Sequence, residues 1–395
     1  MSKKTIRDID VRGRRIFLRV DFNVPIKGGR IGDETRIVAS LPTITYALEQ
    51  GATVICASHL GRPKGKPNPE MSLRPVAPRL CELIGRPVEF AEDCVGDAAR
   101  SAVSRAGKNG VVLLENLRFH PEEEKNDAGF AGELASLADV YVNDAFGSAH
   151  RAHASTEGIV QHVKTAAAGL LMAAELEYLG RALGNPERPF VAVLGGAKVS
   201  DKLEVIQNLL ARVDALVIGG AMAYTFLLAR GAPVGNSLVE RDLVEAARDI
   251  EFRASERALD FELPLDHVVA DRIDASAAHE TIDVGDASIG NRMGVDIGPK
   301  TAGRYRGRIA SAKTVVWNGP MGVFEIDAFA RGTSEVAKAV ADVKGTTIVG
   351  GGDSIAAVKK VGVADRISHI STGGGASLEF LGGRTLPGVA VLPDR

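Results

Sequence analysis

Two lysines stand four residues apart just after a pair of glycines, in the stretch VAVLGGAKVSDKLEVI of residues 191–206. The stretch begins as an apolar strand and breaks at Gly195-Gly196, so Lys198 and Lys202 follow a predicted strand end. If the segment from Lys198 through Lys202 begins a helix, this spacing puts both ammonium groups on one face. Like charges repel there, and the dipole at a helix N-terminus disfavours cations. The pair therefore indicates a strongly negative ligand, and the alternative is two solvated surface lysines.

Charged side chains also follow the four strands predicted in the first half, RIFLRVDFN, ATVICASHLGR, VVLLENLRF and DVYVNDAFGSAH. Guanidinium groups match phosphate and carboxylate oxygens two at a time, so this group predicts a site for a small, multiply anionic ligand, with Asp21 and Asn23 holding a hydroxyl. One arginine after a strand is usually a solvated loop charge, but four strand ends of similar chemistry favour a binding site. The members of the group are Asp21, Asn23, Arg36, His59, Arg62, Arg118 and Arg151. The nearby pair His150 and His153 is typical of hydrogen-bonded scaffolding rather than of a metal site.

The second half ends its predicted strands in glycine, in LGGAK, IGGAM, NGPMG, VGGGDS and STGGGAS. Glycine lets the backbone approach a ligand closely, and the N–H groups at the start of a following helix bind anions. The pattern suits the phosphates of a nucleotide. Neither GxxxxGK[ST] nor GxGxxG occurs, so the two commonest phosphate-binding motifs are absent from this sequence.

The elements that position these residues alternate between short β-branched runs and helix-period segments. The second half offers FVAVLGGAK, ALVIGGAMA, DHVVADR, TVVWNGP, TTIVGGGDS and ISHISTGGG as strands. Apolar strands alternating with helices predict an α/β fold with two doubly wound parallel-sheet domains. The amphipathic segment GLLMAAELEYLGRALGNPERP lies between them and predicts a connecting helix at about residues 170–184.

Composition narrows the class of protein. The 395 residues are 45% hydrophobic and 25% charged with a formal net charge of −2, which argues against nucleic-acid or membrane binding through bulk charge. Cys56, Cys81 and Cys94 form no CxxC pair and are expected to be reduced thiols of a cytoplasmic protein. The charged N-terminal stretch has no apolar core of a secretory signal.

Long motifs along the whole chain resemble the phosphoglycerate kinase family: RVDFNVP, SHLGRPKG, LLENLRFHPEEEKND, YVNDAFGSAHRAHAST, LGGAKVSDK, VWNGPMGVFE, GGGDS and SHISTGGGASLEFL. The resemblance implies a monomeric glycolytic enzyme that reversibly transfers a phosphoryl group between 1,3-bisphosphoglycerate and ADP, giving 3-phosphoglycerate and ATP, with Mg²⁺. It also implies that the two domains are Rossmann-like and that the connecting helix at about 170–184 is a hinge. The phosphoglycerate-binding domain would be residues 1–170 plus about 380–395, and the nucleotide-binding domain residues 171–379.

The same resemblance assigns roles to matching positions. The phosphoglycerate site falls on the seven residues of the first-half group. Arg36, Lys198, Lys202 and Gly352 are implied to be catalytic, with Arg36 and Lys198 stabilising the phosphoryl group in transfer. The nucleotide side falls on Lys202, Asn318, Glu325, Gly351, Gly352, Asp353 and Ser354, where Glu325 holds the ribose hydroxyls and Asp353 binds Mg²⁺.

The sequence departs from the family pattern at Asn291-Arg292, where an aromatic residue is expected near the adenine pocket, and His267 is also untypical. Two other function classes remain as alternatives. A two-lobed sugar-phosphate binding protein would need no Lys198 and would usually carry an export signal. A dinucleotide-dependent oxidoreductase should carry GxGxxG with an acidic residue about 20 positions further on.

Overall fold

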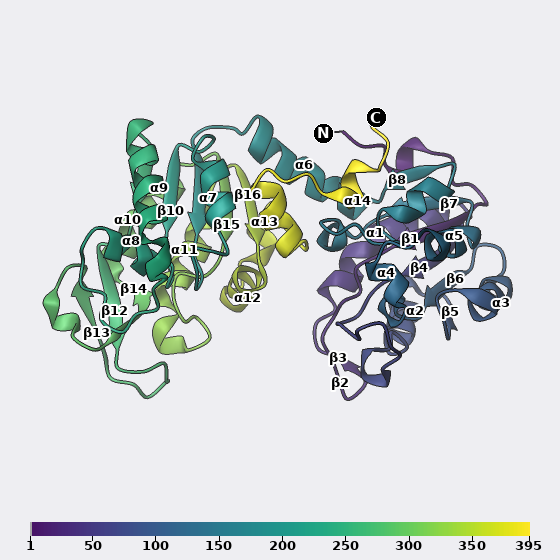
Figure 1. Cartoon of the computed structure of the whole chain (residues 1–395), viewed down its shortest axis with the longest axis horizontal. Coiled ribbons are helices and arrows are strands. Elements are labelled where there is room, and N and C mark those ends of the chain that lie inside the picture. The colour runs from purple at the N-terminus through teal and green to yellow at the C-terminus, as the bar shows by residue number, and fades with distance from the viewer. Residues whose placement is uncertain (1) are drawn as a thin grey trace. The chain divides into compact units, whose positions relative to one another are not determined.

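The computed structural model describes residues 2–395, which form two compact units. The first runs to Glu177 and includes the C-terminal segment Thr385–Arg395, and the second is Tyr178–Arg384. The C-terminal segment packs against the N-terminal one (Figure 1), where the Lys4 backbone N donates to the carbonyl of Pro393 at 2.9 Å. No helix within residues 2–395 is both long and apolar enough to cross a membrane.

A six-stranded parallel sheet forms the centre of the first unit, in the order β5-β6-β4-β1-β7-β8. Its central strands are almost entirely buried, as their continuous apolar runs require when helices cover both faces. Because all six strands run the same way, the loops after them meet at one edge. The strands are β1 (Arg15–Arg19), β4 (Thr53–Ala57), β5 (Val88–Ala91), β6 (Val111–Leu114), β7 (Val140–Asn143) and β8 (Ala166–Ala168).

Helices surround this sheet, and a two-stranded hairpin follows β1 (Figure 1). The hairpin is β2 (Ile26–Lys27) with β3 (Arg30–Ile31). The helices are α1 (Thr35–Glu49), α2 (Val76–Ile84), α3 (Gly96–Ala106), α4 (Pro121–Glu124), α5 (Ala128–Ser136) and α14 (Pro387–Ala390).

The second unit contains another six-stranded parallel sheet, in the order β11-β10-β9-β15-β16-β17. The chain order reverses between β9 and β15, and loops at such a reversal leave a crevice in which α/β proteins bind ligands. The strands are β9 (Phe190–Leu194), β10 (Ala215–Ile218), β11 (Asp260–Glu262), β15 (Thr314–Asn318), β16 (Thr346–Gly350) and β17 (His369–Ile370). The helices are α7 (Leu203–Leu209), α8 (Ala223–Ala229), α9 (Val244–Glu256), α10 (Pro299–Ala310), α11 (Arg331–Asp342), α12 (Gly352–Val361) and α13 (Gly375–Leu381).

Helix α6 (Leu170–Gly184) contains the boundary between the two units. Its first turn is anchored in the first unit, because Asp144, just after β7, accepts hydrogen bonds from the backbone N of Leu171 at 2.9 Å and of Met172 at 3.1 Å. Thr43 of α1 accepts a third from the N of Leu170 at 2.9 Å. Non-local side chains thus satisfy N–H groups that the helix itself leaves unpaired.

The prediction of two parallel-sheet α/β domains is confirmed, and one strand assignment is wrong. The run DHVVADR forms β12 (Asp266–Ala270), which lies in an antiparallel sheet between β13 (His279–Asp283) and β14 (Met293–Ile297) rather than in the parallel sheet. The short strand β11 occupies the sheet edge instead. A short β-branched run indicates a buried strand but carries no information about the direction of its partners.

Candidate functional site

The predicted anion site of the first unit starts from an arginine held by a carboxylate. Arg36, in the first turn of α1, donates from Nη1 to both carboxylate oxygens of Asp21 at 3.0 Å, and Asp21 follows β1 closely. About a third of the Arg36 side chain stays exposed, so other guanidinium N–H groups remain available to a ligand. Asn23 turns its side-chain oxygen to the backbone N of Gly61 at 2.9 Å and thereby holds the loop after β4.

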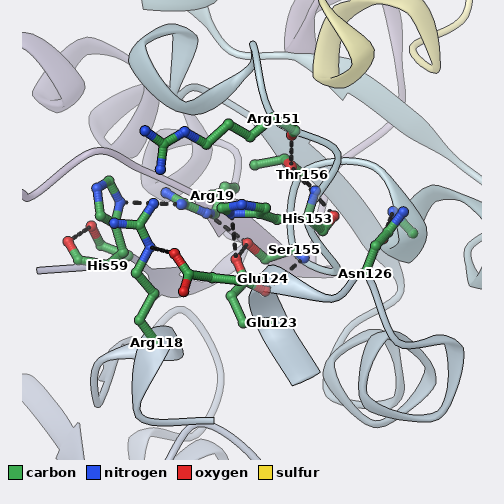
Figure 2. A network of polar contacts seen from close by, with 12 residues as sticks. Arg19, His59, Arg118, Glu123, Glu124, Asn126, Arg151, His153, Ser155 and Thr156 are labelled. Carbon is green, nitrogen blue, oxygen red and sulfur yellow. Dashed lines mark hydrogen bonds and ion pairs between the residues drawn. The ribbon is translucent and has the colours of Figure 1, made fainter. Parts of the chain in front are cut away.

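Arg118, His59 and His153 form a cluster of cationic and imidazole side chains in the same unit (Figure 2). Arg118 and His59 are buried, and burial together with neighbouring arginines lowers the pKa of Arg118 to about 10 and that of His59 well below its usual range. Burial, Arg118 and Arg19 lower the pKa of His153 to about 3. Both imidazoles are therefore neutral at pH 7, which limits charge repulsion inside a cluster of arginines.

Arg19 determines how the His59 ring is protonated. Its Nη2 lies 3.3 Å from Nδ1 of His59. Because a guanidinium group can only donate, Nδ1 must accept, and the neutral ring carries its proton on Nε2. His59 therefore offers an N–H donor to an anion.

A buried chain of hydrogen bonds fixes Arg19 in turn (Figure 2). Arg19 Nε donates to Ser155 Oγ at 2.8 Å, and Ser155 Oγ donates to the carboxylate of Glu123 at 2.6 Å. Glu123 also accepts from the Ser155 backbone N at 3.0 Å and is fully buried. Sequence reasoning missed Arg19, Glu123 and Ser155. The available signal was Arg19 itself, a charged residue inside the apolar strand RIFLR.

The remaining arginines of the predicted group differ in how firmly they are held. Arg151 is partly buried, its Nε lies 3.1 Å from Nε2 of His150, and Figure 2 shows it in the cluster with Arg118 and His59. Arg62 is exposed in the loop after β4, and no contact within residues 2–395 ties its side chain to the other members. The structure thus brings Asp21, Arg36, His59, Arg118 and Arg151 to one edge and leaves Arg62 at its margin.

The loops of the second unit are packed through glycine backbones. A Cβ on Gly195 would lie 2.2 Å from the carbonyl O of Pro320, and one on Gly319 would lie 2.2 Å from the O of Gly195. Gly319 also has φ +98°, a conformation that residues with side chains rarely adopt. Since these loops follow β9 and β15, the strands at the reversal of sheet order, glycine is what allows them to touch.

Lys198 and Lys202 do not share a helix face, so that prediction is wrong. Helix α7 begins at Leu203; Lys202 is its N-cap residue, and Lys198 lies exposed in an irregular loop. Lys202 is buried and donates from Nζ to Oδ1 of Asn318. Burial lowers the pKa of Lys202 to about 8, against the opposing charges of Asp201 and Asp353. The chain leaves β9 through a turn rather than directly into a helix, and glycine positions alone do not show how long such a turn is.

The predicted phosphate loop opens helix α12. Gly351 is its N-cap residue with φ +89°, and Gly352 and Asp353 lie exposed in the first turn. Ser354 is buried, and its hydroxyl accepts a hydrogen bond from the N of Gly319 at 2.6 Å and so supports the loop after β15. The Nδ2 group of Asn318 is buried and has no hydrogen-bond partner within residues 2–395. This amide beside the glycine loops is suited to a ligand oxygen.

A cavity of about 230 Å³ adjoins these loops, and Asp353 and Glu325 line it. Two aromatic rings also line it: Tyr224 and His267 stack with centroids 5.6 Å apart, and the Tyr224 hydroxyl lies 2.7 Å from Nδ1 of His267. The side chain of Arg292 is not among the residues that line the cavity and instead contacts Glu280 and backbone carbonyls. Aromatic side chains at this cavity thus come from Tyr224 and His267 rather than from positions 291 and 292.

Comparisons with known proteins agree with one another. The chain matches the family model described as phosphoglycerate kinase over residues 6–384. It is 58% identical over 403 residues to a phosphoglycerate kinase of Koribacter versatilis, covering all of both chains, and 60% identical over 397 residues to that of Solibacter usitatus, covering 99% of this chain and all of the other. The solved phosphoglycerate kinase from Coxiella burnetii matches with a TM-score of 0.89 at 42% identity, and that from Pyrococcus horikoshii with 0.85 at 37%; each comparison covers 98% of both chains.

Proposed function

Since the chain belongs to the phosphoglycerate kinase family, we propose that its two strand-edge sites bind the two substrates of that reaction. The family's activity is reversible phosphoryl transfer between 1,3-bisphosphoglycerate and ADP, and this chain is a phosphotransferase with a carboxyl acceptor that uses ATP or ADP. The observation that carries the assignment is the contrast between a cluster of cationic side chains in one unit and glycine-opened backbone in the other. Family membership removes both alternatives, the binding protein and the oxidoreductase.

At the first site, we assign the nonreacting phosphate and the hydroxyl of phosphoglycerate to the side chains of the arginine cluster. Arg118 and Arg151 supply guanidinium N–H groups, and His59 donates from Nε2. Arg36 and Asp21 are already paired, so the hydroxyl is held where the arginine and the carboxylate meet. Arg62 completes the anion site from its exposed loop.

At the second site, we assign the nucleotide phosphates to Lys202, Asn318 and the N-terminus of α12 at Gly351 and Gly352. The backbone N–H groups of a helix start, strengthened by the dipole, suit phosphate oxygens. We assign the ribose hydroxyls to Glu325 and the base to the cavity beside Tyr224. Ser354 acts through its bond to Gly319 and is a positioning residue.

Mg²⁺ belongs to the proposal through Asp353. This carboxylate is exposed in the first turn of α12 beside the proposed phosphate site, and carboxylate oxygen is a ligand that Mg²⁺ prefers. When bound with the nucleotide, the ion would neutralise phosphate charge. Asp353 would be its protein ligand.

The chemistry needs cations and alignment rather than a general base. The acceptor carboxylate is already ionised at neutral pH, and phosphoryl transfer depends on positioning and on charge stabilisation around the equatorial oxygens. We assign that stabilisation to Arg36, Lys198, Lys202 and the backbone N of Gly352. The exposure of Lys198 supports this role, because no ion pair within residues 2–395 holds its ammonium, although its charge acts on Glu240.

Substrate-specific binding tests the assignment. Arg62→Ala and Arg151→Ala should weaken 3-phosphoglycerate binding at least tenfold and leave ATP binding nearly unchanged, measured by calorimetry. Arg100→Ala, an exposed arginine paired with Asp97 on α3, is the matched control and should affect neither ligand. Equal losses for both ligands would show that the assignment of sites to units is wrong.

Further predictions concern the assembled protein. We propose a monomer in the cytoplasm, with a phosphoglycerate domain of residues 1–170 plus about 380–395 and a nucleotide domain of residues 171–379. The proposed hinge at residues 170–184 would let ligands control domain closure. Light scattering for mass, and small-angle scattering with each ligand and with both, test these points.

A further inference from the structure

A second group of ligand-type side chains lies in the first unit and has no part in the proposed reaction. Asp93 and Cys94 follow strand β5, and His120 precedes helix α4. One potential ligand atom from each of the three lies within 4.8 Å of the others. The closest pair is His120 Nε2 and a carboxylate oxygen of Asp93, at 2.6 Å.

Thiol, imidazole and carboxylate together identify the class of ion. Mg²⁺ and Ca²⁺ take oxygen ligands, whereas Zn²⁺ accepts sulfur, nitrogen and oxygen in a tetrahedral site. Zinc bonds of about 2.0–2.3 Å place neighbouring ligand atoms roughly 3.3–3.8 Å apart. The His120–Asp93 pair, at 2.6 Å, therefore has to open by about 1 Å, and the widest separation, at most 4.8 Å, has to close by about 1 Å; the partly exposed His120 has room to turn.

Carboxylates surround the three side chains, and a cavity gives solvent access to two of them. A cavity of about 500 Å³ is lined by both Asp93 and His120, so water can supply a fourth ligand from that side. Negative charges face the cluster from two helices, Glu122 and Glu123 of α4 and Glu133 of α5. Burial, with Asp93 and Glu123, raises the pKa of the Cys94 thiol well above its usual range, so the thiolate forms only when it bonds to the ion.

Among the carboxylates that line the cavity, Asp93 is the one grouped with the thiol and the imidazole, and its Oδ1 also accepts from the Cys94 backbone N at 2.6 Å. Glu92 pairs with Arg74, and Glu115 accepts from the Ser72 hydroxyl at 2.6 Å and from the Leu73 backbone N at 2.9 Å. The ring of Phe130 lies against His120 with centroids 5.2 Å apart and supports the imidazole.

We propose that Asp93, Cys94 and His120 form a binding site for Zn²⁺ or a similar transition-metal ion, with water as the fourth ligand. On binding, the Cys94 thiol loses its proton to solvent and the thiolate sulfur bonds to the ion. The proton that Nε2 of His120 shares with Asp93 also leaves, to solvent from a charged ring or to Nδ1 in a neutral one, so that the Nε2 lone pair can bind the ion. The hydrogen bond between His120 and Asp93 is replaced by two bonds to the metal. The site is separate from the Mg²⁺ position proposed at Asp353 and does not depend on the proposed function.

Cobalt titration of the full-length, chelator-treated protein tests the site, because Co²⁺ replaces Zn²⁺ and reports a thiolate ligand through a charge-transfer absorption band. The expected result is one equivalent of Co²⁺ with that band, displaced by Zn²⁺. Cys94→Ser should abolish the band, and His120→Asn should weaken Co²⁺ binding at least tenfold. Cys81→Ser and His162→Asn, a partly exposed thiol and an exposed imidazole elsewhere in the unit, are the controls and should behave as wild type.

Because Cys94 is buried, its variant must be checked for folding by circular dichroism, and His120→Asn provides an independent readout. Zn²⁺ should raise the thermal unfolding midpoint of the wild type and of both controls but not that of His120→Asn. Three results would overturn the site: no band in the wild type, a band that persists in Cys94→Ser, or equal Co²⁺ affinity in wild type and His120→Asn.

Discussion

The two parallel sheets differ in what forms the edge at which their strands end and where we propose that the ligands bind. In the first unit, side chains form the edge, and Arg19 beneath it is fixed by the buried Ser155 and Glu123. In the second unit, backbone forms the edge, and Gly195 and Gly319 touch where no side chain fits. On the proposed assignment, the same architecture would serve a compact anion through arginine forks and an extended nucleotide through open backbone. The residues at the end of each strand, rather than the fold, decide the ligand.

The largest effect is expected on stability, when a buried side chain beneath the edge of the first sheet is removed. Glu123→Ala should lower the free energy of unfolding by about 3–5 kcal/mol, because it leaves the buried Arg19 without its compensating charge and the Ser155 backbone N without an acceptor. Urea denaturation measures the loss. Glu122→Ala, its partly exposed neighbour on α4, is the control and should cost less than about 1 kcal/mol. Similar values for the two variants would mean that the buried network does not stabilise this edge.

The next effect concerns catalysis from the second edge. Lys198→Ala should lower kcat by about 10²- to 10³-fold while leaving both binding constants nearly unchanged, because its ammonium is proposed to meet the phosphoryl group chiefly in the transition state. Lys202→Ala should raise the KM for ATP as well, since that side chain is proposed to hold the phosphates in both states. Steady-state kinetics separates the two.

Lys108→Ala, an exposed lysine of the first unit, is the control for these measurements and should have normal kinetics. A normal kcat for Lys198→Ala would return Lys198 to the role of a solvated loop residue.

The sequence predicted less of the strand-end edge in the second unit than of the one in the first unit. Periodicity identified the parallel sheets, and arginines after strands identified most of the anion cluster, because both signals are local. The antiparallel direction of β12 and the burial of Lys202 against Asn318 could not be predicted from the sequence, since each depends on a partner distant in the chain. The Arg19–Ser155–Glu123 chain was missed for the same reason. Arg19 and Ser155 are 136 residues apart in the sequence, and Ser155 and Glu123 are 32 residues apart.

A smaller effect is expected from adding one methyl group to the second edge. Gly319→Ala forces an alanine into φ +98° with its Cβ against the carbonyl of Gly195, which should cost about 1–3 kcal/mol of stability and raise the KM for ATP. Gly303→Ala in helix α10 is the matched control, because no atom lies within 4 Å of its added Cβ. Alanine there should stabilise by about 0.5–1 kcal/mol. Equal effects of the two changes would contradict the view that this edge is held by backbone contact.

The smallest effect is a difference in pH dependence between the two edges. Lys202 has a pKa of about 8, and a bound nucleotide phosphate would raise it, so its contribution to ATP affinity is complete below about pH 8 and is lost as pH rises through the bound-state value. ATP affinity should therefore fall several-fold, less than about tenfold, between about pH 7.5 and about pH 9. Affinity for 3-phosphoglycerate should stay flat over the same range, because arginines hold that ligand and His59 is neutral throughout. Calorimetry of both ligands on wild type and on Lys202→Arg, which keeps its charge, makes the comparison. Parallel pH profiles for the two ligands, or an unchanged slope for ATP in Lys202→Arg, would exclude the Lys202 ammonium as the titrating group.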